Sequence, residues 1–310
     1  MNRKKIAIIA QIPPPHLGQS IMHKYLIDDK WDEIKKQHIK LELTKNSDQF
    51  GKFSVLKFFG LFKVVFNLWI ERLRGKIEIL YYPPSGPVSR KTFYKDFLIL
   101  FFTRILTKKT VFHFHADKFN NLIKILNPFE LFLARKIYGN PDLCIVILEI
   151  QKNDVSWLNP KNIITIPNGI EDFFDKSKEL LKNDVFTLLY IGLLVDYKGI
   201  EDAISACSIL KNNGISFKFI FVGGWSAENF KCKIEEMIMN FQLQDNVLFV
   251  GEKKGNEKWK YFEEADVLCL PTRNDLMPLC IMEGMMMSLP IISTKIRTIP
   301  YIVDHNINGL

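Results

Sequence analysis

Short apolar runs alternate with amphipathic segments along the whole chain. The runs are rich in β-branched and aromatic residues, which predicts strands joined by helical crossovers, as in parallel sheets. In the first half we predict strands at KIAIIA (5–10), IEILYY (77–82), TVFHFH (110–115), LCIVIL (143–148) and NIITIP (162–167). In the second half we predict strands at FTLLYIG (186–192), FKFIFVG (217–223), NVLFVG (246–251), DVLCLP (266–271) and PIIST (290–294).

The amphipathic segments between these strands predict helices, among them residues 199–210, 228–241 and 278–287. The pattern indicates an α/β protein with two Rossmann-like, doubly wound domains, residues 1–172 and 173–310. The domain change is expected between residues 172 and 183, where a strand ends in Pro-Asn-Gly and a charged, polar stretch follows. Ligands of such sheets bind beyond the carboxyl ends of the strands, so we expect the two domains to face each other across a cleft.

Composition and charge narrow the classes of partner. The chain has 310 residues, of which 47% are hydrophobic and 25% charged, as in a globular protein. Residues 1–172 hold 27 Lys and Arg against 16 Asp and Glu, whereas residues 173–310 hold 15 against 18. A basic first half suits an anionic partner such as a phospholipid surface or a phosphorylated acceptor. The absence of a zinc-finger spacing, an RNP-like motif or a basic-aromatic stripe disfavours nucleic acid.

The sequence pattern predicts no structural metal and no membrane span. The five cysteines are scattered, mostly inside apolar runs and without a CxxC or Cys/His cluster, which favours buried thiols in a reducing cytoplasm. The apolar segments are too short or too often interrupted by charge to span a bilayer. Residues 52–76 predict an amphipathic helix whose apolar residues cover most of its surface, which favours packing on the sheet.

Two motifs in the first half lie at the ends of predicted strands. The loop PPPHLGQS (13–20) places Gly18 where the backbone can approach a ligand and a helix N-terminus can face an anion. A loop of this composition can equally serve only to stiffen a turn. In TVFHFHAD, His113 and His115 share one face of the strand, and His115 lies closer to the strand's end. A histidine there can donate to a substrate hydroxyl or pack in the core, and the core is the more common use.

In the second half, YIGLLVDYKG (190–199) is a strand, a glycine, a short loop and then Lys198-Gly199 at the start of a helix. This arrangement can place an ammonium group and free backbone N–H groups beside one anion, which is how a diphosphate is held without a metal. The segment does not match a Walker A loop. A solvated lysine at a helix start is the alternative interpretation.

The stretch NDLMPLCIMEGMMMSLPII (274–292) places two carboxylates around a helix start. Seven apolar residues separate Asp275 from Glu283, and Pro278 suits the first turn of a helix. We therefore expect Asp275 in the preceding loop and Glu283 in the second turn. A buried Glu needs a partner, and we expect that partner to be a ligand, such as a ribose diol, instead of a protein cation.

These motifs, in this order, resemble the retaining glycosyltransferases of family four, the glycosyl transferases group 1 family with the GT-B fold. The resemblance extends over essentially the whole chain. It is carried by the first Pro/Gly loop, HFHAD, PNGI, the glycine-to-KG segment, FVGG, VLFVG, the Asp275–Glu283 pair with seven residues between, and the closing IVDHNINGL.

The resemblance implies metal-independent transfer of a sugar from a nucleotide-diphosphate donor, with retention at the anomeric carbon, by a hexosyltransferase-type enzyme. No cofactor is implied beyond the nucleotide sugar, and the acceptor is a saccharide or a lipid-linked molecule in surface polysaccharide or glycolipid synthesis. The implied location is cytoplasmic, with peripheral attachment to the inner face of the plasma membrane. The first domain corresponds to the acceptor side and the second to the donor side.

The resemblance also assigns roles to residues. Glu283 corresponds to the residue that holds the donor ribose, Asp275 to the one that binds the sugar hydroxyls, Lys198 to the diphosphate ligand and His115 to a contact of the transferring sugar. The remaining donor-binding positions implied are Gly18, Gly192, Met277 and Leu279.

The sequence departs from the family pattern at several positions. Leu193 stands where the family usually has an arginine, Asp275 replaces the usual Glu, Leu276 replaces the usual Gly, and Leu17-Gly18 replaces two glycines. Family members usually continue beyond the segment that corresponds to HNINGL, so we expect the donor domain of this chain to be C-terminally incomplete.

Two alternative functions remain at this stage. A nucleotide-sugar-binding module without turnover is suggested by the missing arginine. A nucleotide-sugar epimerase fits the two-domain outline but accounts less well for the Asp275–Glu283 segment.

Overall fold

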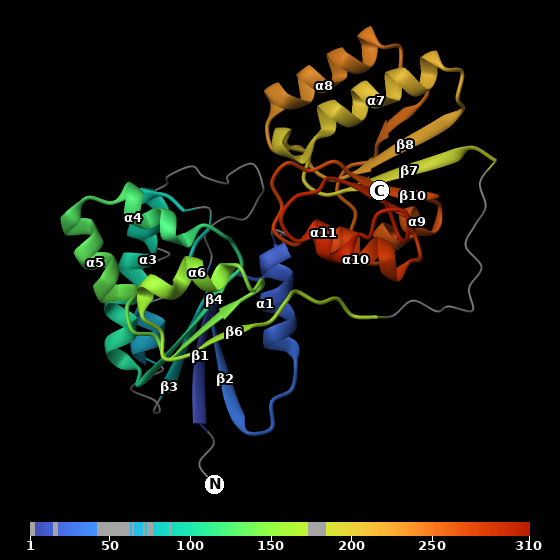
Figure 1. Cartoon of the computed structure of the whole chain (residues 1–310). Coiled ribbons are helices and arrows are strands. Elements are labelled where there is room, and N and C mark those ends of the chain that lie inside the picture. Colours follow the sequence, from blue (N-terminus) through green and yellow to red (C-terminus); the bar gives the residue numbers. More distant parts are fainter. Residues whose placement is uncertain are drawn as a thin grey trace. The chain divides into compact units, whose positions relative to one another are not determined.

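The chain folds into two compact units, Met1–Asn168 and Gly169–Leu310, in a computed structural model (Figure 1). The division lies a few residues before the predicted domain change. The structure describes residues 4–14, 18–41, 63, 65–70, 72, 77–86, 88–172 and 184–310. The predicted helix at residues 52–76 lies largely outside the described residues.

The first unit is built on a six-stranded sheet in the order β2-β1-β3-β4-β5-β6, with every pairing parallel. Its strands are β1 (Lys4–Ala10), β2 (Ile34–Lys40), β3 (Ile77–Tyr82), β4 (Lys109–Phe114), β5 (Leu143–Val146) and β6 (Ile163–Thr165). The described helices of this unit are α1 (Gly18–Asp28), α3 (Arg90–Thr103), η2 (Arg104–Leu106), η3 (Phe119–Asn121), α4 (Leu122–Ile125), α5 (Pro128–Tyr138), α6 (Gln151–Val155) and η4 (Ser156–Leu158).

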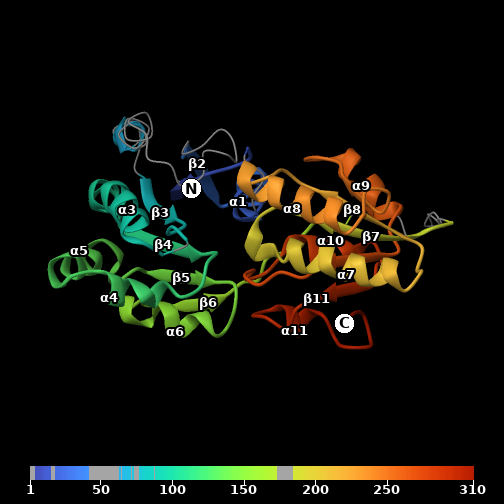
Figure 2. The ribbon, with the colours of Figure 1, turned by 90° about the horizontal axis from the view of Figure 1, so that it is seen from above.

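Helices cover both faces of this sheet, which explains why its inner strands are apolar on both sides. On one face, alternate residues of β1, β3, β4 and β5 pack against α3, α4 and α5 in the larger core of the unit. On the other face, Ile6, Ile8, Ala10 and Tyr81 pack against the end of α1. The sheet is therefore the middle layer of a three-layer unit (Figures 1 and 2).

The second unit is built on a five-stranded parallel sheet in the order β11-β10-β7-β8-β9. Its strands are β7 (Phe186–Ile191), β8 (Phe217–Val222), β9 (Val247–Phe249), β10 (Val267–Leu270) and β11 (Ile291–Ser293). Its described helices are η5 (Asp196–Lys198), α7 (Ile200–Asn212), α8 (Glu228–Asn240), α9 (Asn256–Glu263), α10 (Leu279–Met286) and α11 (Ile299–Ile302). One continuous core of aliphatic and aromatic side chains holds these elements together.

The structure confirms the predicted fold class of two doubly wound parallel sheets and all ten predicted strands, whose ends differ from the predicted ones by at most two residues. The strand that sequence analysis missed is β2, IKKQHIK, at the edge of the first sheet. Its lysines hide the apolar pattern, and charged residues are common on edge strands because they oppose pairing with other chains.

Candidate functional site

The second sheet brings Lys198 and Asp275 together at the point where its strand order reverses. The chain runs from β7 to β8 and β9 in one direction and then returns to β10 and β11 on the other side of β7. Lys198 follows β7 and Asp275 follows β10, so both lie beyond the carboxyl ends of adjacent strands. The Lys198 ammonium donates to both carboxylate oxygens of Asp275, at 2.7 and 2.6 Å. Such a switch point is where open α/β sheets bind ligands.

Glycines let the loops at the carboxyl ends of these strands approach one another closely. A side chain on Gly199, which has a φ of +73°, would meet the carbonyl oxygen of Pro271 at 1.9 Å, and one on Gly223 would meet that of Gly192 at 1.8 Å. Gly192 has a φ of +154° and donates its N–H to Val222. Only glycine fits these positions, and Gly199 fixes Lys198 beside the end of β10.

The start of α10 lies next to Asp275. Asp275 lies in the loop before the helix and Glu283 in its second turn, as predicted. Pro278 is the N-cap and provides no side-chain hydrogen bond to the helix. Leu279 is the first helical residue and is buried, whereas Met277 is half-buried in the loop. The first N–H groups of a helix attract negative charge, so a cation and a helix N-terminus lie close to one another here.

Glu283 has a protein partner, so the prediction that only a ligand would satisfy it is wrong. The Lys258 ammonium of α9 lies 2.6 Å from Glu283 Oε1. Both side chains are largely buried, with exposed fractions of 19% for Lys258 and 11% for Glu283. The Lys258 ammonium compensates the negative charge of the buried Glu283 carboxylate. This pairing explains why a glutamate is tolerated in the apolar helix α10.

Sequence reasoning missed Lys258 because no spacing rule connects it to Glu283. The segment NEKWKYFE predicts an amphipathic helix on which a lysine is usually solvated. The structure instead places the Lys258 ammonium 4.2 Å from the centre of the Trp259 ring. Trp259, next to Lys258 in the sequence, was the one available signal for this position. A lysine that packs over an aromatic ring has its ammonium group held in place.

In the first unit, a histidine cluster lies on the α1 face of the sheet. His113 and His115 lie on one face as predicted, with ring centres 4.0 Å apart, and His23 of α1 lies 5.0 Å from His115. The Tyr81 hydroxyl of β3 is 2.6 Å from His113 Nδ1, and His23 Nδ1 is 3.0 Å from the carbonyl oxygen of Gln11. Sequence analysis did not include His23, which joins the cluster only through the packing of α1.

Burial keeps these histidines neutral. It lowers the pKa of His23 from 6.5 to about 4 and that of His113 to about 3. The pKa of His115 lies well below its usual value, because burial and the two neighbouring rings disfavour the charged form, while the nearby Asn168 side chain opposes the shift. Both ring nitrogens of His115 are buried. His115 is thus a neutral donor or acceptor and not a cation.

Gly18 begins α1, at the carboxyl side of β1, as the sequence predicted. The switch point of the first sheet lies between β1 and β3, since β2 flanks β1 on the other side. Gly18 therefore occupies the edge of the sheet at which a ligand is expected.

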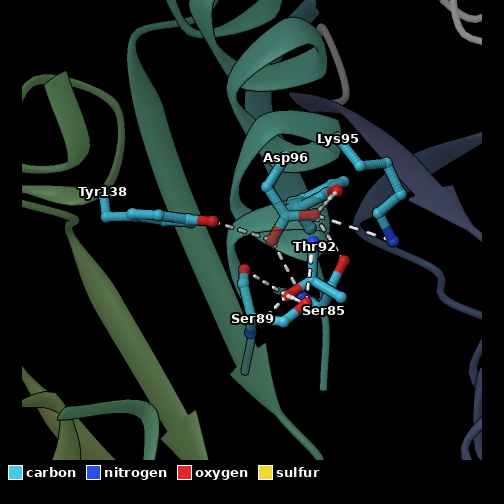
Figure 3. Close-up of polar contacts among 7 residues, drawn as sticks. Ser85, Ser89, Thr92, Lys95, Asp96 and Tyr138 are labelled. Carbon is cyan, nitrogen blue, oxygen red and sulfur yellow. Dashed lines mark hydrogen bonds and ion pairs between the residues drawn. The ribbon is translucent and has the colours of Figure 1, made fainter. Parts of the chain in front are cut away.

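A buried carboxylate anchors the loop that follows β3. Asp96 of α3 is fully buried and accepts hydrogen bonds from Tyr82, Tyr138 and the backbone and hydroxyl of Ser85 (Figure 3). Its oxygens are thus saturated by donors from three elements. The network holds the loop in place beside the loop after β4, where a side chain on Gly86 would meet that of Ala116.

Among the described residues, no three His, Cys, Asp or Glu side chains are arranged to hold a metal ion, and no helix is long and apolar enough to cross a membrane.

Comparison with known families explains the second unit. Residues 171–310 match the family model of glycosyl transferases group 1. We call the second unit the group 1 domain after this match. The chain is 32% identical over 128 residues to the amylovoran biosynthesis glycosyltransferase AmsK of Erwinia amylovora. That match covers 39% of this chain and 31% of AmsK, so the chain spans less than a third of this curated relative.

Solved structures extend the likeness to both units. Sucrose-phosphate synthase from Thermosynechococcus elongatus has a TM-score of 0.72 at 17% identity, covering 99% of this chain and 85% of that one. Anabaena HepE in complex with UDP and glucose has a TM-score of 0.66 at 15% identity, also covering 99% and 85%. At such identities the likeness establishes the fold. The first unit and the group 1 domain are thus the two Rossmann-like domains of a GT-B protein.

Proposed function

We propose that this protein is a retaining glycosyltransferase that moves a sugar from a nucleotide-diphosphate donor to a saccharide or lipid-linked acceptor. The observation that supports the proposal most is the Lys198–Asp275 pair, which lies at the switch point of the group 1 domain, beside the start of α10. An ammonium group and a helix N-terminus there suit an anion with several charges. Two similar proteins, a glycosyltransferase of amylovoran biosynthesis and a protein solved in complex with UDP and glucose, fit such chemistry.

In this proposal the donor diphosphate takes Lys198 as its counter-ion, and Asp275 turns from the lysine to the sugar hydroxyls. Glu283 accepts from the ribose diol while Lys258 holds its carboxylate in orientation. The backbone at Gly18, Gly192, Met277 and Leu279 borders the donor. His115, as a neutral imidazole, contacts the transferring sugar.

The reaction then depends on electrostatics instead of a covalent intermediate. Negative charge grows on the departing phosphate as the sugar acquires oxocarbenium character. A fixed ammonium group and helix N–H groups stabilise that charge more in the transition state than in the bound donor, which lowers the barrier. The chain needs no acid and nucleophile pair of the kind found in glycoside hydrolases, and we propose that transfer is metal-independent.

The basic first unit is proposed to keep the enzyme at the inner face of an anionic membrane, where a lipid-linked acceptor in surface polysaccharide or glycolipid synthesis is found. The second candidate is a nucleotide-sugar-binding module without turnover, which is favoured by Leu193 at the position of the family's arginine.

A donor screen tests the proposal. Purified protein is heated with a panel of nucleotide sugars, because a ligand that binds only the folded state raises the melting temperature. The donor that stabilises most is then incubated with acceptors, and the anomeric configuration of the product is read by NMR. We expect stabilisation and a product with the donor's configuration. Stabilisation without transfer or donor hydrolysis supports the binding module, and an inverted product contradicts retention.

A further inference from the structure

The first unit exposes large apolar side chains on four neighbouring helices, α3, η2, α4 and α5. Phe101 and Phe102 of α3 are 50% and 37% exposed, Ile105 of η2 is 71% exposed, and Phe129 and Phe132 of α5 are 69% and 56% exposed. Together with Ile125 of α4 they define what we call the α3–α5 surface. Single exposed apolar residues need no explanation, but a group of this size on adjacent elements marks an interaction site.

Hydrogen bonds fix these helices side by side. The Tyr94 hydroxyl near the start of α3 donates to Glu130 Oε1 near the start of α5, at 2.6 Å. At the other end, the Arg104 guanidinium donates to the carbonyl oxygens of Ile137 and Gly139, at 2.7 and 2.9 Å. The two helices therefore run parallel in contact along their length, and both views show them with α4 on one side of the unit's sheet (Figures 1 and 2).

The exposed side of α3 cannot turn inward, because its opposite side carries the buried Asp96 network. Phe93, Asp96, Ile99 and Leu100 face the core. Phe101 and Ile105 are exposed and lie four residues apart, a spacing that places two side chains on the same face of a helix. The apolar exposure is thus set by the fold and is not the result of a loosely packed helix.

The part of the chain that carries the α3–α5 surface is strongly basic. Residues 90–136 contain ten Lys or Arg and three Asp or Glu. Two of the three acids are withdrawn from the surface, since Asp96 is fully buried and Glu130 is buried beside Tyr94 and Arg90. Lys124 and Lys136 are exposed on α4 and α5, and the Lys136 ammonium lies 5.7 Å from the centre of the Phe132 ring.

We propose that the α3–α5 surface docks on an anionic phospholipid membrane. Aromatic and aliphatic side chains flanked by lysines match the interfacial zone, where rings enter the acyl boundary and ammonium groups bind headgroup phosphates. A second copy of the chain is a poorer partner, because two such surfaces would bring like charges together. This inference gives the proposed membrane association a defined surface and does not depend on the donor chemistry.

Vesicle sedimentation tests the proposal with the full chain. Vesicles contain phosphatidylcholine alone or mixed with phosphatidylglycerol. We expect binding that needs phosphatidylglycerol and weakens as salt rises. The double variant Phe101→Ser/Phe132→Ser and the double variant Lys124→Glu/Lys136→Glu should each weaken binding roughly tenfold or more.

Matched variants in the second unit serve as controls. Tyr301→Ser/Ile307→Ser removes side chains that are 84% and 83% exposed, and Lys218→Glu/Lys260→Glu reverses two exposed charges. Both should bind vesicles like the wild type. All four variants should keep the wild-type melting temperature and nucleotide binding, which separates this test from that of the proposed function.

Three outcomes would overturn the proposal. The first is an equal loss of binding in the control variants. The second is binding that ignores lipid charge, or no binding to either vesicle. The third is self-association of the wild type in sedimentation equilibrium that Phe101→Ser/Phe132→Ser abolishes, because it would assign the surface to a second copy.

Discussion

Asp275 and Glu283 each form an ion pair with a lysine. Variants of these pairs can tell whether a carboxylate binds the donor or only stabilises the fold. If Glu283 binds the donor ribose, Glu283→Gln should weaken the affinity for a nucleoside diphosphate by about 1.5 to 3 kcal/mol, the scale of a charge-assisted hydrogen bond. Lys258→Met should change that affinity less, because it leaves the acceptor carboxylate in place. Isothermal titration of both variants measures the difference.

The free energy of unfolding provides a control for the Lys258 and Glu283 variants. Lys258→Met leaves a largely buried carboxylate without its cation, so it should lower the free energy of unfolding more than Lys258→Met/Glu283→Gln does. If the two single variants lose nucleotide affinity equally, Glu283 acts only through the ion pair and its assignment to the ribose is wrong.

The buried histidines predict a pH dependence of stability. His23 has a pKa of about 4 in the folded chain and 6.5 as its ordinary value, so between these values the unfolded chain binds a proton that the folded chain does not. The stability is fully present above pH 6.5 and is lost as the pH falls toward 4, by about 1.4 kcal/mol per pH unit for each such histidine.

Urea unfolding between pH 7 and pH 4.5 measures this slope. His23→Asn should make the slope of the first unit shallower, because one depressed histidine is removed. A slope that is unchanged in this variant would contradict the assignment of His23 as neutral and buried.

At the scale of elements, Gly199 joins η5 to α7 and lets the backbone pass the end of β10. Gly199→Ala meets two penalties, a left-handed φ of +73° and the carbonyl oxygen of Pro271 at 1.9 Å. Gly214 has nearly the same φ, +71°, and nothing within 4 Å. Gly199→Ala should therefore lower the free energy of unfolding by about 1 to 3 kcal/mol more than Gly214→Ala, the cost of overpacking.

Nucleotide affinity adds a second readout to this comparison. Gly199→Ala shifts the backbone that positions Lys198, so it should weaken nucleoside diphosphate binding, whereas Gly214→Ala should leave it unchanged. Equal effects of the two variants on both stability and affinity would show that the approach to Pro271 has no role in the site.

The strands were predictable because their signal is local. A run such as FTLLYIG is apolar on both faces, and that pattern alone indicates a buried parallel strand. The edge strand β2 was not predicted because lysines interrupt its apolar residues. The loop position of Asp275 and the helical position of Glu283 also followed from local signals, with Pro278 marking where α10 begins.

At the scale of the whole molecule, the contacts that were missed join residues far apart in the sequence. Lys258 reaches Glu283 from another helix, and His23 of α1 contacts His115, which follows β4. No periodicity or motif encodes such pairings, since they depend on how α9 and α1 pack on their sheets. The order of motifs along the chain was sufficient to predict the fold, whereas the side chains that surround each motif had to come from the structure.

Calorimetric titration of the full chain with nucleoside diphosphates tests most directly whether Lys198 belongs to a donor site. We expect at least one of them to bind, and Lys198→Ala to weaken that binding by about 1.5 to 3 kcal/mol, the scale of a hydrogen bond to a charged group. Lys231→Ala, which removes a lysine paired with Glu228 on the surface of α8, should bind like the wild type. Equal affinity of Lys198→Ala and the wild type, or no binding of any nucleoside diphosphate, would contradict a donor site at the junction of β7 and β10.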